Sequence, residues 1–258
     1  MFLSFVDFIG KTSIDACSRV GNLGLFCYDS IFTLFTTQPK IKKIFDQMNY
    51  IGVKSMSIIM LISITVGAVL ALQSYEGLHK FGADQFIGPI LFLSLSRELS
   101  PVLTAIMVIG RAGSAMTAEI GTMRITEQID ALQTLCINVK QYLIVPRLVS
   151  STIILPFLTM FCTFFGVFSG YFISVYSLNL NPETFWDQII ENVEMWDITH
   201  GLIKAIVFGF LLSLICTYKG FITRGGAKGV GQATTQAVVY ANVTIFIADY
   251  ILTSLLMN

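Results

Sequence analysis

Five long apolar stretches dominate the pattern of hydrophobic and polar positions along the chain. They cover residues 55–75, 86–110, 148–177, 198–218 and 234–257. Each can cross the hydrocarbon core of a bilayer, which takes about 20 helical residues. None shows the alternation over about ten residues that marks a transmembrane β-strand. The pattern predicts an all-α integral membrane protein with about five transmembrane helices.

The first fifty residues differ from these stretches because their apolar positions alternate with charges. One helical stripe is apolar: Phe2, Phe5, Val6, Ile9, Ala16, Cys17 and Val20. Another stripe is charged: Asp7, Lys11, Asp15 and Arg19. Such a helix suits the headgroup region of a membrane. We therefore predict an interfacial amphipathic helix in residues 1–50 and a transmembrane domain in residues 51–258; ordinary packing of the helix against the bundle is the alternative.

A second amphipathic segment interrupts the third connection between spans. Asn181 is a helix N-cap candidate, and Pro182 suits the first helical turn. The segment then continues with apolar positions at helical spacing: Phe185, Trp186, Ile189, Ile190, Val193 and Trp196. Tryptophans concentrate where membrane meets water, so this segment is expected at the interface or packed on the bundle.

Basic residues alternate between the connections, which sets the predicted orientation. The segment before the first span, the second connection and the fourth connection hold most of them: Lys40, Lys42, Lys43, Lys54; Arg111, Arg124, Lys140, Arg147; Lys219, Arg224, Lys228. The first connection has only Lys80, and residues 178–197 have five acidic residues and no basic one. Because cytoplasmic loops are enriched in Lys and Arg, the second and fourth connections are predicted to be cytoplasmic.

Composition narrows the possible functions further. The chain is 54% hydrophobic and 12% charged, and its 16 basic and 16 acidic residues cancel, so no net field attracts nucleic acid. The five cysteines show no CxxC spacing, so neither a metal site nor a disulfide framework is predicted. His79 and His200 are isolated, and the run from Gly225 to Gly231 lacks the Walker A order. We predict a non-catalytic protein that binds no cofactor itself.

Two charges within the second apolar stretch are the main functional signal. Arg97 and Glu98 fall at its midpoint, where each charge costs about 2.5–3.5 kcal/mol on insertion scales. Neighbours in sequence point about 100° apart on a helix, so each needs its own partner. Candidates at membrane depth are Gln73, Tyr75, Lys204 and Asp249. The charges either staple helices together or line a partly hydrated cavity, and a substrate cavity is our preferred interpretation.

The second connection contains an amphipathic segment at residues 123–135. Met123, Ile125, Ile129, Leu132 and Cys136 share one predicted helical face, and Thr122 or Thr126 is a cap candidate. Such a helix either lies on the membrane or docks another protein. Because the chain has no Walker A motif, active transport would need a separate subunit or an ion gradient.

Long ordered motifs run through these same positions. They include Arg97-Glu-Leu-Ser-Pro-Val-Leu-Thr-Ala, Gly110-Arg-Ala-Gly-Ser-Ala, Ala118-Glu-Ile-Gly-Thr-Met, Thr126-Glu-Gln-Ile-Asp-Ala-Leu, Pro146-Arg, Gly201-Leu-Ile-Lys, Gly229-Val-Gly-Gln-Ala-Thr-Thr and Asp249-Tyr. From about Gly52 to the C-terminus the chain resembles the MlaE/YrbE permease family. Ser100 stands where that family usually has Gly, and Asn138-Val where Asp-Pro is common.

The resemblance implies a permease that moves phospholipid or a related lipid between the membranes of a double-membrane envelope. It implies a homodimer bound to an ABC ATPase subunit, which holds the ATP, and to an MCE-domain lipid-binding protein. A bacterial inner membrane is favoured over a plastid inner envelope. The expected lipid cavity comprises Leu70, Gln73, Tyr75, Arg97, Glu98 and Lys204. The expected ATPase-coupling residues are Glu119, Met123, Thr126, Glu127 and Asp130.

Two other functions remain open on the residues alone. An ion-coupled secondary transporter would use Glu98 or Asp249 as its proton or cation site and need no ATPase. A structural scaffold would need no charges at membrane depth. No inverted repeat is detectable, which speaks against the first.

Overall fold

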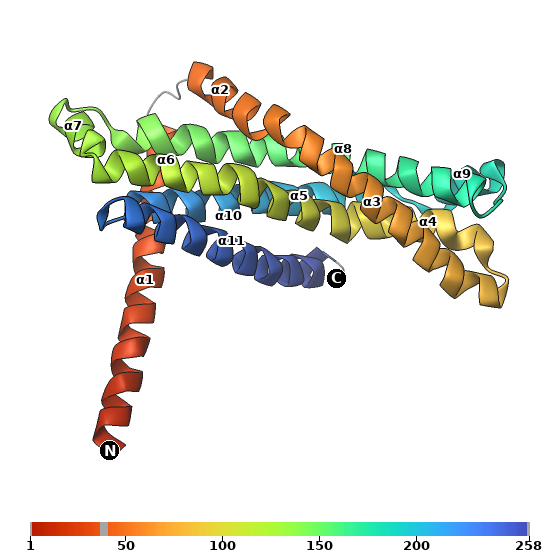
Figure 1. The fold of residues 1–258 in the computed structure, drawn as a ribbon, viewed down its shortest axis with the longest axis horizontal. Helices are drawn as coiled ribbons and strands as arrows, with labels where there is room; N and C mark the ends of the chain where they lie inside the picture. Colours follow the sequence, from red (N-terminus) through yellow and green to blue (C-terminus); the bar gives the residue numbers. More distant parts are fainter. Residues whose placement is uncertain (1, 37–40, 257–258) are drawn as a thin grey trace.

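Five helical segments of the chain are long and apolar enough to cross a membrane, which confirms the predicted number of spans. The computed structural model describes residues 2–36 and 41–256, and within these it contains helices and no strand. The five segments are Ile41–Phe81, Asp84–Ile125, Lys140–Tyr176, Met195–Phe221 and Gly226–Leu256. They lie roughly side by side in one elongated bundle (Figure 1).

The first segment consists of α2 (Ile41–Ile51) and α3 (Val53–Leu78), with a break at Gly52. Arg111 of the second segment holds this break. Its guanidinium donates to the Ser55 hydroxyl at 2.8 Å and to the carbonyl of Ile51 at 3.2 Å. The arginine therefore pairs backbone oxygens that the interrupted helix leaves without an intrahelical donor.

The second segment continues beyond the predicted end at residue 110. After the short turns η1 (His79–Phe81) and η2 (Asp84–Phe86), it runs through α4 (Ile87–Ser94), α5 (Ser100–Val108) and α6 (Ser114–Ile125). Two π-helical turns join these helices, η3 (Leu95–Leu99) and η4 (Ile109–Gly113). Past Gly110, the Arg111 side chain pairs with the α2–α3 break. The helical segment is therefore longer than the predicted apolar stretch.

The remaining spans are less interrupted. The π-helical turn η5 (Lys140–Ile144) leads into α8 (Val145–Tyr176), which contains Pro156 and stays helical throughout. Then follow α9 (Pro182–Asn192), α10 (Met195–Phe221) and α11 (Gly226–Leu256). The predicted cap of α9 is confirmed, because the Asn181 side chain accepts from the backbone N–H of Glu183 at 2.9 Å.

The spans pack around α8 and α10, with α11 on the outside of the bundle. A Cβ added at Gly67 of α3 would lie 2.0 Å from the carbonyl oxygen of Gly166 on α8, so the two backbones touch. The small residues at this contact therefore serve packing within one chain. Only 11% of the most apolar 18-residue stretch of α11 is buried. Its C-terminal half exposes a row of apolar side chains: Val239, Val243, Phe246, Ile247, Ile251 and Leu255.

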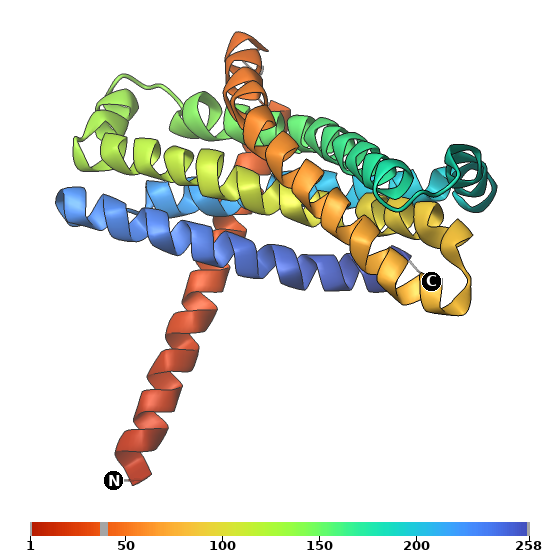
Figure 2. The same cartoon turned by 45° about the vertical axis from the view of Figure 1, so that its right-hand side comes forward.

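Helix α1 (Phe2–Thr36) leaves the bundle and runs across its long axis (Figures 1 and 2). If the bundle axis follows the membrane normal, this direction places α1 in the membrane plane, as an interfacial helix requires. Of the residues in the predicted apolar stripe, Cys17 is the one whose side chain the structure describes, and that side chain is exposed. The other residues of the stripe lie outside the described side chains. Of the described side chains of α1, Phe26 is the buried apolar one that joins the core.

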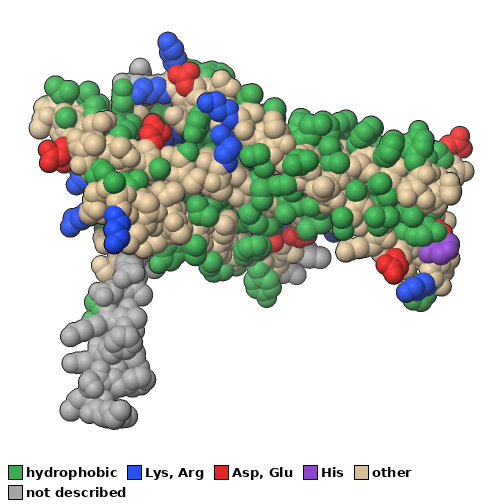
Figure 3. Space-filling view, in the orientation of Figure 1, with side chains coloured by type: hydrophobic (Ala, Val, Ile, Leu, Met, Phe, Trp, Pro, Cys, Tyr) green, Lys and Arg blue, Asp and Glu red, His purple; other side chains and the backbone are tan. Residues whose placement is uncertain are grey.

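The two ends of the bundle differ in charge as the alternating connections predict. One end, which we term the basic end, holds the connections with Arg124, Lys140, Arg224 and Lys228 and the start of α2 (Figure 3). The opposite end, the acidic end, holds α9 with its acidic side chains and the turn at Lys80. The positive-inside rule assigns the basic end to the cytoplasm.

This orientation predicts opposite accessibility of two cysteines. Native Cys136 is exposed in the second connection, and Glu191 is exposed on α9. In a chain with Cys17→Ser, Cys27→Ser and Glu191→Cys, a membrane-impermeant maleimide on intact spheroplasts should label the introduced thiol on α9 only. Cys136 should react after lysis. Reaction of Cys136 before lysis would reverse or discard the topology.

Candidate functional site

The second span presents Arg97 and Glu98 from the π-helical turn η3. A π turn inserts one extra residue and is frequent at functional sites. The two neighbouring side chains point apart and find separate partners, both on α10. Arg97 pairs with Asp197, and Glu98 pairs with Lys204. The prediction that each charge needs its own partner is thereby confirmed.

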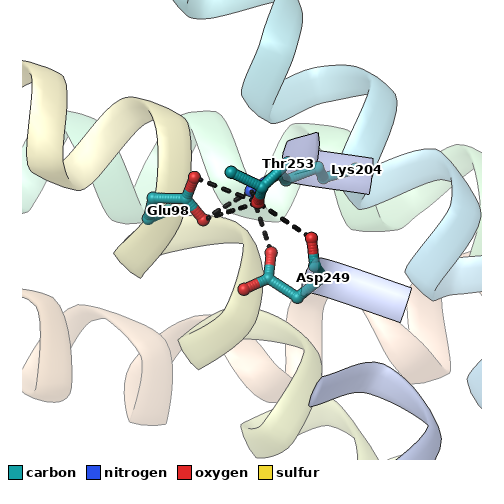
Figure 4. A network of polar contacts seen from close by, with 4 residues as sticks. All are labelled: Glu98, Lys204, Asp249 and Thr253. Atoms are coloured by element: carbon teal, nitrogen blue, oxygen red, sulfur yellow. Dashed lines mark hydrogen bonds and ion pairs between the residues drawn. The ribbon is translucent and has the colours of Figure 1, made fainter. Parts of the chain in front are cut away.

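Lys204 is the centre of a four-residue cluster that joins three spans (Figure 4). Its ammonium is fully buried and pairs with Glu98 of η3. It also donates to the Thr253 hydroxyl at 2.7 Å and lies 2.9 Å from Asp249 Oδ1, both on α11. The ammonium thus donates hydrogen bonds to Glu98 and Thr253 and forms an ion pair with Asp249. The ammonium therefore holds α11 and η3 to α10.

Arg97 binds a carboxylate that also begins α10. The Arg97 Nε donates to Asp197 Oδ1 at 2.7 Å, while Asp197 Oδ2 accepts from the backbone N–H of Glu194 at 2.9 Å. Asp197 and Glu194 form a capping box at the first turn of α10. The aspartate is only 3% exposed, so its charge is compensated by the guanidinium and the N-terminal backbone amides.

Arg97 and Glu98 lie in the half of the second helical segment that is nearer the acidic end. That segment runs from Asp84 to Ile125, so its midpoint lies past Glu98. Arg97 meets the first turn of α10, and Lys204 lies seven residues, or about 10 Å, further along that helix.

Close packing fixes the position of the two ion pairs relative to each other. Gly201 of α10 lies between Asp197 and Lys204, and a Cβ there would come within 2.0 Å of the Ser96 carbonyl oxygen. The backbone of η3 therefore rests directly on α10. A side chain at position 201 would push η3 away and pull Arg97 and Glu98 from their partners.

The cluster is buried on one side and open on the other. Glu98 is 39% exposed and Arg97 38% exposed, whereas Lys204 is 0% exposed. With Asp249 and Asp197 ionised, the five charged groups sum to one negative charge. A cationic and an anionic side chain of η3 are thus each partly exposed. Groups of opposite charge offer contacts to both ends of a zwitterion.

The other predicted cavity residues lie on α3. Leu70 packs against the small hydrophobic cluster that includes Leu95, and Leu99 of η3 joins the same cluster. Tyr75 stacks on His79 with ring centroids 4.7 Å apart, and Gln73 is exposed. Among the described contacts neither Gln73 nor Tyr75 reaches the charged cluster. The structure thus brings Glu98 and Lys204 together, with Leu70 beside η3.

The predicted single helix at residues 123–135 is two helices with a corner between them. Met123 belongs to the end of α6, and α7 (Gln128–Thr134) begins after Glu127, which adopts a left-handed backbone with φ of 60°. The capping prediction was also wrong, because the Thr126 hydroxyl donates to the Thr122 carbonyl at 2.8 Å and so closes α6. Glu127, Thr126 and Asp130 are exposed at the tip of the basic end.

Two ion pairs support this corner. Glu119 forms an ion pair with Arg147 Nη2 at 2.7 Å, and that guanidinium is nearly buried at the start of α8. Asp130 accepts from Arg124 at 2.6 Å, which ties α7 to α6. Ile129 is fully buried under α7, while Leu135 remains exposed. The corner is thus anchored on its inner face and presents acidic side chains and one leucine outward.

Three contributing residues escaped the sequence analysis. Asp197 was assigned to the loop before the fourth span, although its spacing after Glu194 is that of a capping box. Thr253 carries no charge and gave no signal. Arg147 was counted as a topology marker and as part of a family motif, and neither predicted that the structure buries it against Glu119.

Fold and site together define a multi-pass helical membrane protein with ionised groups paired between its spans, a construction typical of membrane transport proteins. The family model described as Permease MlaE matches residues 44–255. The chain therefore belongs to the MlaE family of ABC transporter permeases, as its sequence motifs predicted.

Relatives cover nearly the full length of the chain. A probable ABC transporter permease protein of Rickettsia typhi is 40% identical over all of both chains. The intermembrane phospholipid transport system permease protein MlaE of Haemophilus influenzae is 34% identical over 100% of this chain and 99% of its own. The chloroplastic protein TRIGALACTOSYLDIACYLGLYCEROL 1 of Arabidopsis thaliana is 43% identical over 81% of this chain and 59% of its own.

The cluster predicts that Lys204 is needed for stability. Lys204→Met leaves Glu98 and Asp249 beside each other without a cation, and loss of one partner of a buried ion pair costs about 3–5 kcal/mol. Thermal unfolding in detergent should show this loss, whereas Lys80→Met at an exposed turn should have no effect. Adding Glu98→Gln and Asp249→Asn to Lys204→Met should restore most of the stability. A melting temperature of Lys204→Met equal to that of the wild type would contradict the stabilising role of Lys204.

Proposed function

We propose that this permease moves phospholipid between the membranes of a double-membrane envelope, driven by a separate ATPase subunit. The observation that carries the proposal is the pairing of half-exposed Arg97 and Glu98 against fully buried partners on α10. The name of the Haemophilus relative, an intermembrane phospholipid transport system permease protein, supports the substrate class.

The chemistry of the cluster suits a phospholipid headgroup. The guanidinium of Arg97 binds a phosphate through charge-assisted hydrogen bonds, and the carboxylate of Glu98 binds a headgroup amine. Lys204 keeps Glu98 in place from the buried side. Leu70 and the other apolar side chains beside η3 contact the acyl chains of the lipid. Gln73 and Tyr75 continue the path of the lipid along α3.

The ATPase subunit binds at the basic end, on the corner between α6 and α7. Its contact residues are Glu127, Thr126 and Asp130 on the outer face, with Met123 and Glu119 transmitting movement to α6 and α8. Arg147 supports this role because it joins Glu119 to the buried start of α8. Force on α7 therefore acts on two spans at once, and α6 continues as one helical segment to η3.

Two further partners complete the proposal. A second copy of the chain packs on the apolar face of α11, which leaves most of its surface exposed in the single chain. A lipid-binding MCE-domain protein receives or delivers lipid at the acidic end. The proposed location of the assembly is a bacterial inner membrane, which the names and bacterial hosts of the permease relatives support; a plastid inner envelope is the alternative that the chloroplastic relative supports.

Glu98→Gln should abolish transport while the protein still assembles. After this change Lys204 keeps Asp249 at 2.9 Å and Thr253 at 2.7 Å, so the buried ammonium stays compensated. In vesicles containing the permease with its ATPase, lipid movement should fall to background, and the melting temperature should stay near wild type.

The matched control for this change is Glu76→Gln, which alters an exposed carboxylate on α3. It should transport at the wild-type rate. Wild-type transport by Glu98→Gln, or ATP-independent transport that follows a proton gradient, would contradict the proposal; the second result would favour an ion-coupled transporter.

Glu127→Lys should weaken ATPase binding. The substitution reverses a charge on the exposed corner and keeps the same left-handed backbone cost, so the fold is unaffected. Co-purification of the ATPase subunit and its stimulated ATP hydrolysis should both drop several-fold. Glu183→Lys on exposed α9 at the other end should change neither. Equal ATPase recovery with Glu127→Lys and wild type would place the docking surface elsewhere.

A further inference from the structure

An apolar groove lies between α1 and the first turns of α8, far along the bundle from the acidic end. Ile31 and Leu34 of α1 form one wall, Val149 and Ile153 of α8 form the other, and Phe210 of α10 forms the floor. The cavity volume is about 270 Å³. None of these side chains belongs to the charged cluster, and none has a role in the proposed transport.

The groove offers only hydrocarbon to an occupant. Its two polar side chains are already paired within their own helices. The Ser30 hydroxyl donates to the Phe26 carbonyl at 2.7 Å, and the Thr152 hydroxyl donates to the Leu148 carbonyl at 2.8 Å. A ligand for this groove is therefore an alkyl chain and not a polar group.

The length of the groove suits part of one acyl chain. The α8 residues that line it extend from Val145 to Ile153, which is about 12 Å of helix. The hydrocarbon core of a bilayer is about 30 Å thick, so this length lies within a single leaflet.

The groove opens to the membrane and not to the transport site. Ile31 and Ile153 at its mouth are both exposed. Phe210 follows Lys204 by six residues, which places it about 120° round α10 from the cluster. The opening of the groove is therefore in contact with the acyl chains of the bilayer.

Positive charge marks the end of the groove where headgroups lie. Lys140 precedes the groove-lining part of α8 by one turn and donates to Asp29, next to Ser30, at 2.6 Å. One of its three ammonium donors serves that carboxylate. Lys43 sits 2.8 Å from the centroid of the Tyr142 ring on the same turn. Two cations beside the groove complement the phosphate of a lipid whose chain enters it.

We propose that one bilayer phospholipid binds here, with an acyl chain in the groove and its phosphate near Lys140. This lipid is separate from transported lipid and fastens α1 to the bundle. The helix needs such support because, among its described side chains, Phe26 is the buried hydrophobic anchor in the core. The inference goes beyond the proposed transport function and does not depend on it.

The test is site-specific labelling by a photoreactive lipid. The full-length permease is reconstituted in vesicles of phosphatidylethanolamine and phosphatidylglycerol, with a small fraction of phosphatidylethanolamine carrying a diazirine in one acyl chain. After irradiation, mass spectrometry should find lipid adducts concentrated on residues 30–34 and 145–153. Glu98→Gln should keep these adducts, which separates this site from transported lipid.

Two filling variants block the groove from opposite walls. Val149→Phe acts from α8, and Ile31→Trp acts from α1 outside the bundle core, so at least one should fold normally. Both should lose the adducts. The controls are the same kinds of change at exposed positions away from the groove, Val53→Phe and Leu25→Trp, which should keep them.

Three outcomes would overturn the proposal. Adducts spread equally over the exposed face of α8 at Phe157 and Phe164 would indicate ordinary bulk lipid. Adducts that persist in both filling variants would place the lipid elsewhere. A photoreactive amino acid at Leu34 that captures polypeptide and no lipid would identify a protein as the occupant.

Discussion

The burial of one lysine ammonium constrains much of this structure. Lys204 lies on α10 without exposure, and a charge in that position requires compensation from every available direction. Glu98 supplies it from η3, and Asp249 and Thr253 supply it from α11. The outermost span, α11, is thereby tied to the bundle by polar contacts at its C-terminal part. Its apolar surface remains free for lipid or a second copy.

The same constraint links the site to the long second span. The π turn η3 places Arg97 and Glu98 toward two points on α10, and Gly201 between those points lets the backbones touch. From η3 the helix continues to the α6–α7 corner at the basic end. A change at that corner and a change at the cluster therefore act on one continuous element. This continuity gives the proposed ATPase a physical route to the proposed lipid site.

The five spans and the charge difference between the two ends could be predicted from the sequence, because long apolar runs and Lys/Arg placement are local signals. The need of Arg97 and Glu98 for separate partners followed from helix geometry alone. Asp197 was missed because a charge beside an apolar run looks like a span boundary, and only the tertiary contact with Arg97 shows its burial. The corner at Glu127 was missed because its left-handed backbone is held by packing of Ile129 and the ion pairs around it, not by a glycine.

We infer that the open side of the charged cluster binds lipid while the buried side holds the helices together. A photoreactive amino acid at Leu70, beside η3, in the permease reconstituted with its ATPase separates these two roles. Phospholipid crosslinks are expected at Leu70 and should disappear in Glu98→Gln, with crosslinks at exposed Phe157 unchanged. Equal crosslinking at Leu70 in wild type and Glu98→Gln, or none in either, would contradict it.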